Sequence, residues 1–146
     1  MTQTQITIND VYIPLLEDMS RVQILYGGSS SGKSVFKAQQ VALDLIAGGR
    51  NYLVCRAVAR TLRRSVINEI RKAISDAGLT QYFDVNKSEG IINCKNGYQA
   101  LFAGLDDTEK IKSITPEKGV ITDVWIEEAT EVQRDDIKQL MKRQRG

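Results

Sequence analysis

The chain has 146 residues, of which 42% are hydrophobic and 26% charged, values typical of one soluble globular domain. Its net charge of +2 is too small to indicate nucleic-acid binding by itself. The sequence holds no histidine, which excludes a histidine base, and Cys55 and Cys94 lie in apolar runs typical of buried free thiols. No apolar run approaches the ~20 residues of a membrane span, and the N-terminus lacks a secretory pattern, so we expect a cytosolic protein.

Residues 27–34, GGSSSGKS, match the phosphate-binding P-loop pattern G-x-x-x-x-G-K-[ST]. The apolar run 22–26 before them predicts a strand, and residues 34–46 predict a helix that stops at Gly48 and Gly49. Such a helix would bury Val35, Ala38, Val41, Ala42 and Leu45. A strand, a glycine loop and a helix point several backbone N–H groups at one anion. We therefore expect a nucleotide phosphate to contact Gly27, Gly28, Ser29, Ser30, Ser31, Gly32, Lys33 and Ser34.

Individual loop residues have separate expected roles. Gly27 and Gly32 can adopt backbone angles closed to other residues, which lets the main chain approach the phosphates. Lys33 is expected to reach the β- and γ-phosphates, and the Ser34 hydroxyl to ligate Mg²⁺. The alternative is a Gly/Ser turn that happens to precede a helix. It accounts poorly for a complete match to the P-loop pattern that is flanked by a strand pattern and a helix pattern.

The following segments alternate between strand and helix patterns. Residues 51–55 predict a second strand, and an amphipathic helix is predicted from an N-cap at Thr61 to a stop at Gly78. Its apolar stripe consists of Leu62, Val66, Ile70, Ile74 and Ala77. Apolar runs 90–94 and 98–102 flank an Asn-Gly pair, which predicts a β-hairpin, and the polar residues 104–118 predict a surface loop. The pattern favours an α/β fold: a mostly parallel sheet flanked by helices, with one hairpin.

The apolar run 120–126 ends in two adjacent acids, Glu127 and Glu128. Next to a P-loop, such a strand is expected to be the Walker B element, because phosphoryl transfer needs a metal-side acid and a group that positions water. We expect Glu127 to face the Mg²⁺ shell through water and Glu128 to orient the attacking water. A buried strand running into a charged helix start is the alternative, since further acids follow closely.

In this order, the segments resemble the large subunit of phage terminase, the ATP-driven motor that packages double-stranded DNA, and in particular its PBSX-like branch. Residues 26–34 are similar to the Walker A motif of that branch and 125–131 to its Walker B motif. Residues 54–66 resemble its second strand and following helix, and 102–114 the segment after its hairpin. The resemblance implies a P-loop NTPase fold of ASCE type with ATP and Mg²⁺ as cofactors. It implies that Lys33 and Ser34 contact phosphate and Mg²⁺, that Glu127 is the Walker B acid, and that Glu128 is the catalytic glutamate.

The resemblance also implies that the full-length protein has double-stranded DNA, the portal and the small terminase subunit as partners. It implies a ring-shaped motor at the procapsid portal in the host cytoplasm. Family members continue with a further ATPase strand and a nuclease domain of RNase H type. We therefore expect residues 1–146 to be a partial N-terminal ATPase domain without the nuclease domain. Alone, they would be a monomer with weak ATPase activity and no membrane contact.

Three points stay open at the level of sequence. Many terminases carry an arginine in the Walker A loop, where this chain has serines, so a transition-state arginine must come from elsewhere. Arg56 and Arg60 are candidates, although ordinary surface charge explains them equally well. The residues that contact the nucleotide base follow no fixed sequence pattern, and Tyr12, Ile13 and Gln23 are candidates for these contacts. The alternative functions are another P-loop ATPase acting on DNA, of helicase or recombination type, and a nucleotide-binding module without turnover.

Overall fold

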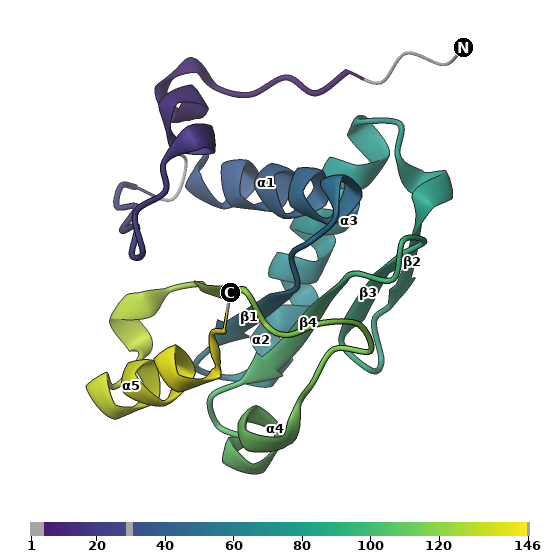
Figure 1. The fold of residues 1–146 in the computed structure, drawn as a ribbon. Coiled ribbons are helices and arrows are strands. Elements are labelled where there is room, and N and C mark those ends of the chain that lie inside the picture. The colour runs from purple at the N-terminus through teal and green to yellow at the C-terminus, as the bar shows by residue number, and fades with distance from the viewer. Residues whose placement is uncertain (1–4, 29–30, 146) are drawn as a thin grey trace.

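The computed structural model describes residues 5–28 and 31–145, which form a five-stranded sheet with helices on both faces (Figure 1). The strand order is β2-β3-β4-β1-β5, in which β4, β1 and β5 are parallel and β2, β3 and β4 are antiparallel. The strands are β1 (Tyr52–Arg56), β2 (Phe83–Asn86), β3 (Ile91–Cys94), β4 (Gln99–Gly104) and β5 (Asp123–Ile126). The predicted α/β class and the β3–β4 hairpin are confirmed, and β2 extends the antiparallel part beyond the prediction.

Two apolar cores lie on opposite faces of the sheet. The helices are α1 (Lys33–Ala47), α2 (Ala59–Arg64), α3 (Val66–Asp76), α4 (Thr108–Ser113) and α5 (Arg134–Arg143), with short 3-10 turns η1 (Asp10–Glu17), η2 (Thr80–Tyr82) and η3 (Ala129–Glu131). Side chains alternate along a strand, so Val54 of β1 packs with α1 and α3, whereas Leu53 packs with α4 and α5. Figure 1 shows these two helix pairs on either side of the strands.

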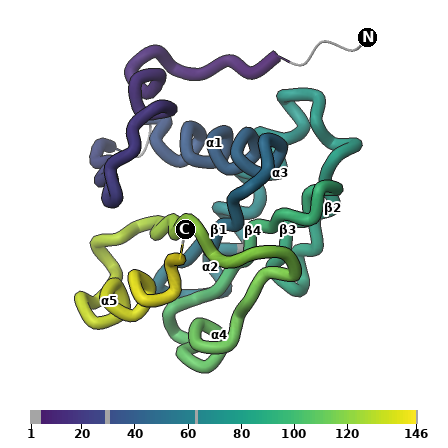
Figure 2. The backbone as a smooth tube through the Cα atoms, viewed as in Figure 1, coloured from purple at the N-terminus to yellow at the C-terminus, as the bar shows by residue number. Residues whose placement is uncertain are grey.

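The predicted strand before the P-loop is not formed. Residues 22–26 join none of the strand pairs of the described residues, and Val22, Ile24 and Tyr26 are 61%, 79% and 92% exposed. A strand is stable only when its N–H and C=O groups meet those of a neighbour. In Figure 2 the purple trace of this segment runs to one side of the strands. The apolar, β-branched run 22–26 therefore has the composition of a strand, but no neighbouring strand of the described residues pairs with it.

The helix predicted from Thr61 to Gly78 is split in two. α2 already begins at Ala59 after Val58, and Ser65 separates it from α3. The Ser65 hydroxyl donates to the Thr61 carbonyl at 2.8 Å, a local bond that competes with helix geometry. The predicted Thr61 N-cap is wrong, since its hydroxyl donates to the Val58 carbonyl. The stripe itself is confirmed, because its five side chains are all buried.

Two smaller predictions also need correction. In α1, Val35 is 47% exposed and Phe36 is buried instead, so the buried stripe is displaced at its first turn. The predicted loop 104–118 contains the short helix α4, whose N-terminus is capped by the Asp107 carboxylate accepting from the Lys110 N–H at 3.1 Å. The polar composition of this segment gave no sign of a helix in the sequence.

The remaining expectations concern the thiols and the membrane. Cys55 and Cys94 are buried free thiols, as predicted. Within residues 5–28 and 31–145, no helix has the length and apolar character that a bilayer crossing needs.

Candidate active site

The carboxyl ends of β1 and β5 and the first turn of α1 meet at one edge of the sheet. The Glu127 N–H donates to the Cys55 carbonyl at 2.9 Å, which extends the β1–β5 pairing by one residue. Because side chains alternate along β5, Glu127 lies on the same face as Trp125, the face that α1 covers. We call this region the carboxyl edge, and it comprises residues 27, 28 and 31–34, Arg56 and residues 127–131.

A direct hydrogen bond joins the two predicted nucleotide motifs. The Ser34 hydroxyl, in the first turn of α1, donates to Oε1 of Glu127 at 2.7 Å, although the residues are 93 positions apart. A hydroxyl beside a carboxylate is the pair of ligands that Mg²⁺ takes from a protein when phosphates supply the rest. The described residues hold no group of three or more His, Cys, Asp or Glu suited to a metal. The pair therefore fits Mg²⁺ bound together with a nucleotide.

The loop before α1 has the features of an anion cradle. Gly32 adopts the left-handed conformation, with φ 81°, which glycine tolerates without strain. The Lys33 ammonium donates to the carbonyls of Gly27 and Gly28 at 3.1 and 3.4 Å, so it lies against the loop. The Ser31 hydroxyl is buried and has no partner among the described residues. A phosphate oxygen would satisfy such a donor, so these residues fit an anion. The predicted contacts of Ser29 and Ser30 lie outside the described residues.

Tyr12 supports this loop from η1. Its hydroxyl donates to the Ser31 carbonyl at 2.7 Å, and its ring stacks on Phe36 with centroids 4.9 Å apart. The sequence suggests Tyr12, together with Ile13 and Gln23, as a contact of the nucleotide base. Ile13 is 48% exposed, and the Gln23 amide donates to the Asp18 carbonyl. No local pattern marks Tyr12 as a support of the loop, because the contact crosses the chain to residues 31 and 36.

Glu128 has an unusual backbone. Its φ of 53° makes it the one non-glycine residue with positive φ in the described part of the chain. A left-handed conformation costs a side-chain-bearing residue roughly 1–3 kcal/mol, and such residues cluster at active sites. Glu128 begins the turn η3, where the Glu131 N–H donates to its carbonyl at 3.0 Å. Its exposed carboxylate forms no hydrogen bond with another described residue, so Glu128, unlike Glu127, is not brought into contact with Ser34.

The structure separates the two candidate arginines. One Arg56 nitrogen donates to the Ser65 hydroxyl at 3.2 Å, and the other terminal nitrogen lies 3.8 Å from the Glu131 carboxylate. The Arg60 side chain is exposed and forms no ion pair with the described residues. Arg56 is therefore part of the carboxyl edge, whereas Arg60 is a surface charge in this structure.

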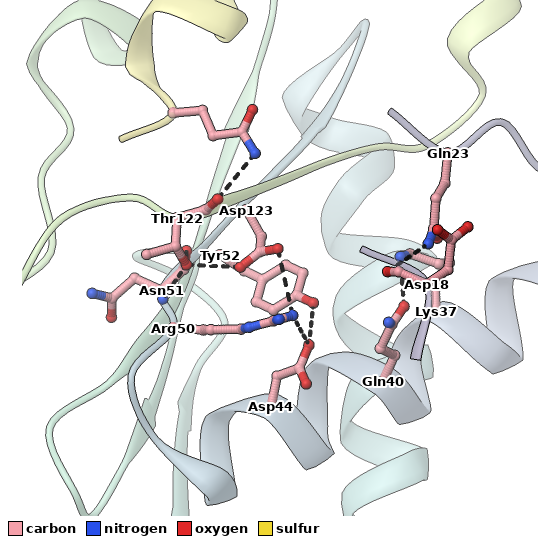
Figure 3. Close-up of polar contacts among 11 residues, drawn as sticks. Asp18, Gln23, Lys37, Gln40, Asp44, Arg50, Asn51, Tyr52, Thr122 and Asp123 are labelled. Atoms are coloured by element: carbon pink, nitrogen blue, oxygen red, sulfur yellow. Dashed lines mark hydrogen bonds and ion pairs between the residues drawn. The ribbon is translucent and has the colours of Figure 1, made fainter. Parts of the chain in front are cut away.

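A second polar cluster lies at the opposite, amino end of β1 and β5 (Figure 3). The Tyr52 hydroxyl donates to Asp44 of α1 at 2.5 Å, and Arg50 lies 3.3 Å from Asp44 and 3.8 Å from Asp123. Thr122 donates to the Asp123 carboxylate at 2.7 Å. Burial, together with the negative charge of Asp44, raises the pKa of the Tyr52 hydroxyl and keeps it neutral. We call these five residues the amino-edge cluster.

Lys37 lies on α1 between the two edges. Its ammonium donates to the Gln40 side chain at 2.7 Å (Figure 3). Burial lowers the pKa of Lys37, and the carboxylates of Asp44 and Asp123 oppose this effect. One stripe of α1 thus carries polar side chains from the P-loop to the amino-edge cluster.

Comparisons with known proteins place these features in a family. The family model described as phage terminase large subunit matches residues 19–146. The chain is 34% identical over 123 residues to the PBSX phage terminase large subunit of Bacillus subtilis (strain 168), covering 84% of this chain and 28% of that protein. It is 32% identical over 114 residues to the terminase large subunit of Bacillus phage SPP1, covering 77% and 27%. The chain therefore spans less than a third of the length of these relatives.

Solved structures share the fold. The large terminase of a thermophilic bacteriophage superposes with a TM-score of 0.60 at 17% identity, covering 80% of this chain and 29% of that one. The same terminase in complex with ADP gives a TM-score of 0.59 at 14% identity over the same shares of the two chains.

Proposed function

We propose that this chain, which belongs to the phage terminase large subunit family, is the ATP-binding and ATP-hydrolysing part of a viral DNA-packaging motor. The observation that carries the proposal is the 2.7 Å hydrogen bond between Ser34 and Glu127, because it joins the P-loop and the acidic strand end at one point. The ADP complex of the thermophilic phage terminase supports nucleotide as the ligand of this fold.

In this proposal the loop residues bind the nucleotide phosphates. They are Gly27, Gly28, Ser29, Ser30, Ser31, Gly32, Lys33 and Ser34. Lys33 turns from the loop carbonyls to the β- and γ-phosphates, where its charge also serves catalysis. Ser34 and Glu127 would hold Mg²⁺, which would neutralise charge on the phosphate oxygens. Tyr12 fixes the loop through the Ser31 carbonyl.

Glu128 is the proposed catalytic residue. Its carboxylate accepts a hydrogen bond from the attacking water and orients it toward the γ-phosphate. Two observations support this role: the strained backbone of Glu128 and its position directly after Glu127, which contacts Ser34. Strain of this kind persists only where surrounding contacts maintain it.

We also infer that residues 1–146 are a partial ATPase domain. The apolar run 22–26 before the P-loop is exposed and pairs with no strand of the described residues, which supports a sheet that further strands would complete. The nuclease domain lies outside these residues in the proposal. Double-stranded DNA, the portal and the small subunit are proposed partners of the full-length ring motor in the host cytoplasm, and residues 1–146 alone are a monomer.

Single-turnover hydrolysis of ATP, with and without Mg²⁺, tests the function. We expect Mg²⁺-dependent phosphate release that is slow, since the loop lacks an arginine and an arginine finger accelerates the reaction by about 10³–10⁵. Nucleotide binding without any phosphate release would favour the binding-module alternative. The family match weighs against a helicase or recombination ATPase.

A further inference from the structure

Arg56 joins three segments at the carboxyl edge. It ends β1, and its side chain is only 20% exposed. One terminal nitrogen donates to the hydroxyl of Ser65, the residue that separates α2 from α3. The other faces the carboxylate of Glu131, the last residue of η3. Arg56 therefore connects the sheet, the α2–α3 junction and the turn that carries Glu128.

The turn that begins at Glu128 has few contacts of its own. Within the described residues, two backbone hydrogen bonds hold it, from the Glu131 N–H to the Glu128 carbonyl and from the Val132 N–H to the Ala129 carbonyl. Glu128 is in the left-handed conformation, which these short-range bonds must maintain against the preference of a non-glycine residue. Among the described residues, the Arg56–Glu131 ion pair is the side-chain interaction that ties the far end of this turn to the sheet.

The same contacts argue against Arg56 as a finger for a neighbouring subunit. An arginine that acts in trans must be free to leave its own subunit, whereas both terminal nitrogens of Arg56 contact groups of the same chain. The Ser65 hydroxyl is itself fixed, since it donates to the Thr61 carbonyl at 2.8 Å.

We propose that Arg56 is a positioning residue for ATP hydrolysis: it acts within its own subunit and holds the Glu128 turn through Glu131, with Ser65 as its anchor. The inference rests on the proposed function, because it assumes that Glu128 orients the attacking water. Lysine cannot replace Arg56 fully, since it lacks the planar fork that reaches two acceptors at once.

The test compares Arg56→Ala, Arg56→Lys and Glu131→Gln with the control Arg60→Ala in the 146-residue chain. Hydrogen exchange by NMR should show faster exchange of the Glu131 and Val132 amides in the first three variants. Single-turnover hydrolysis should slow by roughly 10–100-fold in Arg56→Ala, because small misplacements of a reacting group are costly. Glu131→Gln should slow it by about 2–5-fold, as for a partly exposed ion pair. Arg56→Lys should lie between them, and Arg60→Ala should match the wild type.

Two further measurements separate positioning from other roles. ADP affinity should stay within about twofold in all variants, since Arg56 forms no hydrogen bond or ion pair with the described residues of the P-loop. The double variant Arg56→Ala/Glu131→Gln should be no slower than Arg56→Ala, because the two side chains form one interaction.

Unchanged amide exchange and hydrolysis in Arg56→Ala would overturn the inference. Slower hydrolysis in Arg56→Ala with normal exchange and a fully active Glu131→Gln would overturn it in favour of direct contact with the phosphate. Parallel loss of ADP affinity would show a general structural role instead. Absence of hydrolysis in the wild type would refute the proposed function, a failure visible before any variant is compared. If Arg56→Ala does not fold, Arg56→Lys and Glu131→Gln carry the same test.

Discussion

The carboxyl edge and the amino-edge cluster both join α1 to β5, at opposite ends of the same strands, yet their polar groups are used differently. In the amino-edge cluster, Tyr52, Arg50 and Thr122 all bind the carboxylates of Asp44 and Asp123. At the carboxyl edge, the buried Ser31 hydroxyl has no partner among the described residues. The first group is satisfied by the fold, and the second leaves hydrogen-bonding capacity unused.

The backbone conformation also differs between the carboxyl edge and the amino-edge cluster. Glu128 is left-handed at the carboxyl edge, whereas Asp123 and Tyr52 begin regular paired strands. An unsatisfied buried donor and a strained backbone destabilise a fold, so their occurrence together at one edge supports the proposed ligand site there. We therefore expect the two polar bridges to differ in role, with the carboxyl edge forming the proposed nucleotide site and the amino-edge cluster contributing to stability.

Among variants that test the difference between the two edges, we expect the largest effect on the rate of ATP hydrolysis. Glu128→Gln should lower the single-turnover rate by about 10²–10⁴-fold, because the amide cannot activate water as a carboxylate does. ADP affinity should be unchanged, since the Glu128 carboxylate forms no hydrogen bond with the described residues of the loop. Phosphate release measured by rapid quench checks the rate. A wild-type rate in Glu128→Gln would transfer the catalytic role to Glu127.

The next effect concerns Mg²⁺ at the carboxyl edge. Ser34→Ala and Glu127→Gln each remove one member of the hydrogen-bonded pair, so the Mg²⁺ concentration needed for half-maximal nucleotide binding should rise by roughly 10–100-fold, as for loss of a charged contact. Titration of ADP affinity against Mg²⁺ measures it. An unchanged Mg²⁺ dependence in both variants would remove the pair from the metal site.

Changes in the amino-edge cluster should act on stability instead. Tyr52→Phe removes the hydroxyl that donates to Asp44, a hydrogen bond to a charged group, and should reduce the free energy of unfolding by about 1–3 kcal/mol. Urea denaturation monitored by the fluorescence of Trp125 measures this change. ADP affinity should not change. A clear loss of nucleotide affinity without loss of stability would break the division between the two edges.

The smallest effect is a pH dependence in the core. Burial raises the pKa of the Cys55 thiol to about 12, whereas it titrates near its ordinary value in the unfolded chain. The unfolded state therefore loses its proton first, and stability falls as the pH rises above about 9. Relative to Cys55→Ala, the wild type should lose about 1.5 kcal/mol more between about pH 7 and pH 10. Parallel pH profiles for the two proteins would contradict this.

Local patterns were sufficient for part of the fold and of the site. α1 and the β3–β4 hairpin follow from periodicity and glycine positions, and the loop and acid motifs can be recognised within a few residues. Their contact depends on the β1–β5 register, which brings Glu127 to Ser34 across 93 positions. Residues 22–26 show the opposite case, since a strand pattern cannot reveal whether a pairing partner is present.

The contacts of single side chains were the least predictable. The helix break at Ser65 depends on one hydroxyl, and the same hydroxyl receives Arg56. Tyr12 reaches the P-loop from a segment that has no motif of its own. These are long-range or side-chain-specific interactions, which periodicity and composition do not encode.

Calorimetric titration of ADP into the wild type and Lys33→Ala, with Mg²⁺ present, tests the nucleotide site most directly. Lys138→Ala, which removes an exposed lysine of α5, is the matched control. The wild type and the control should bind one ADP with the same affinity, and Lys33→Ala should bind about 10–150-fold more weakly, because charge-assisted hydrogen bonds to phosphate are lost. Equal affinity for Lys33→Ala and the wild type, or no binding to the wild type, would contradict a nucleotide site at the carboxyl edge.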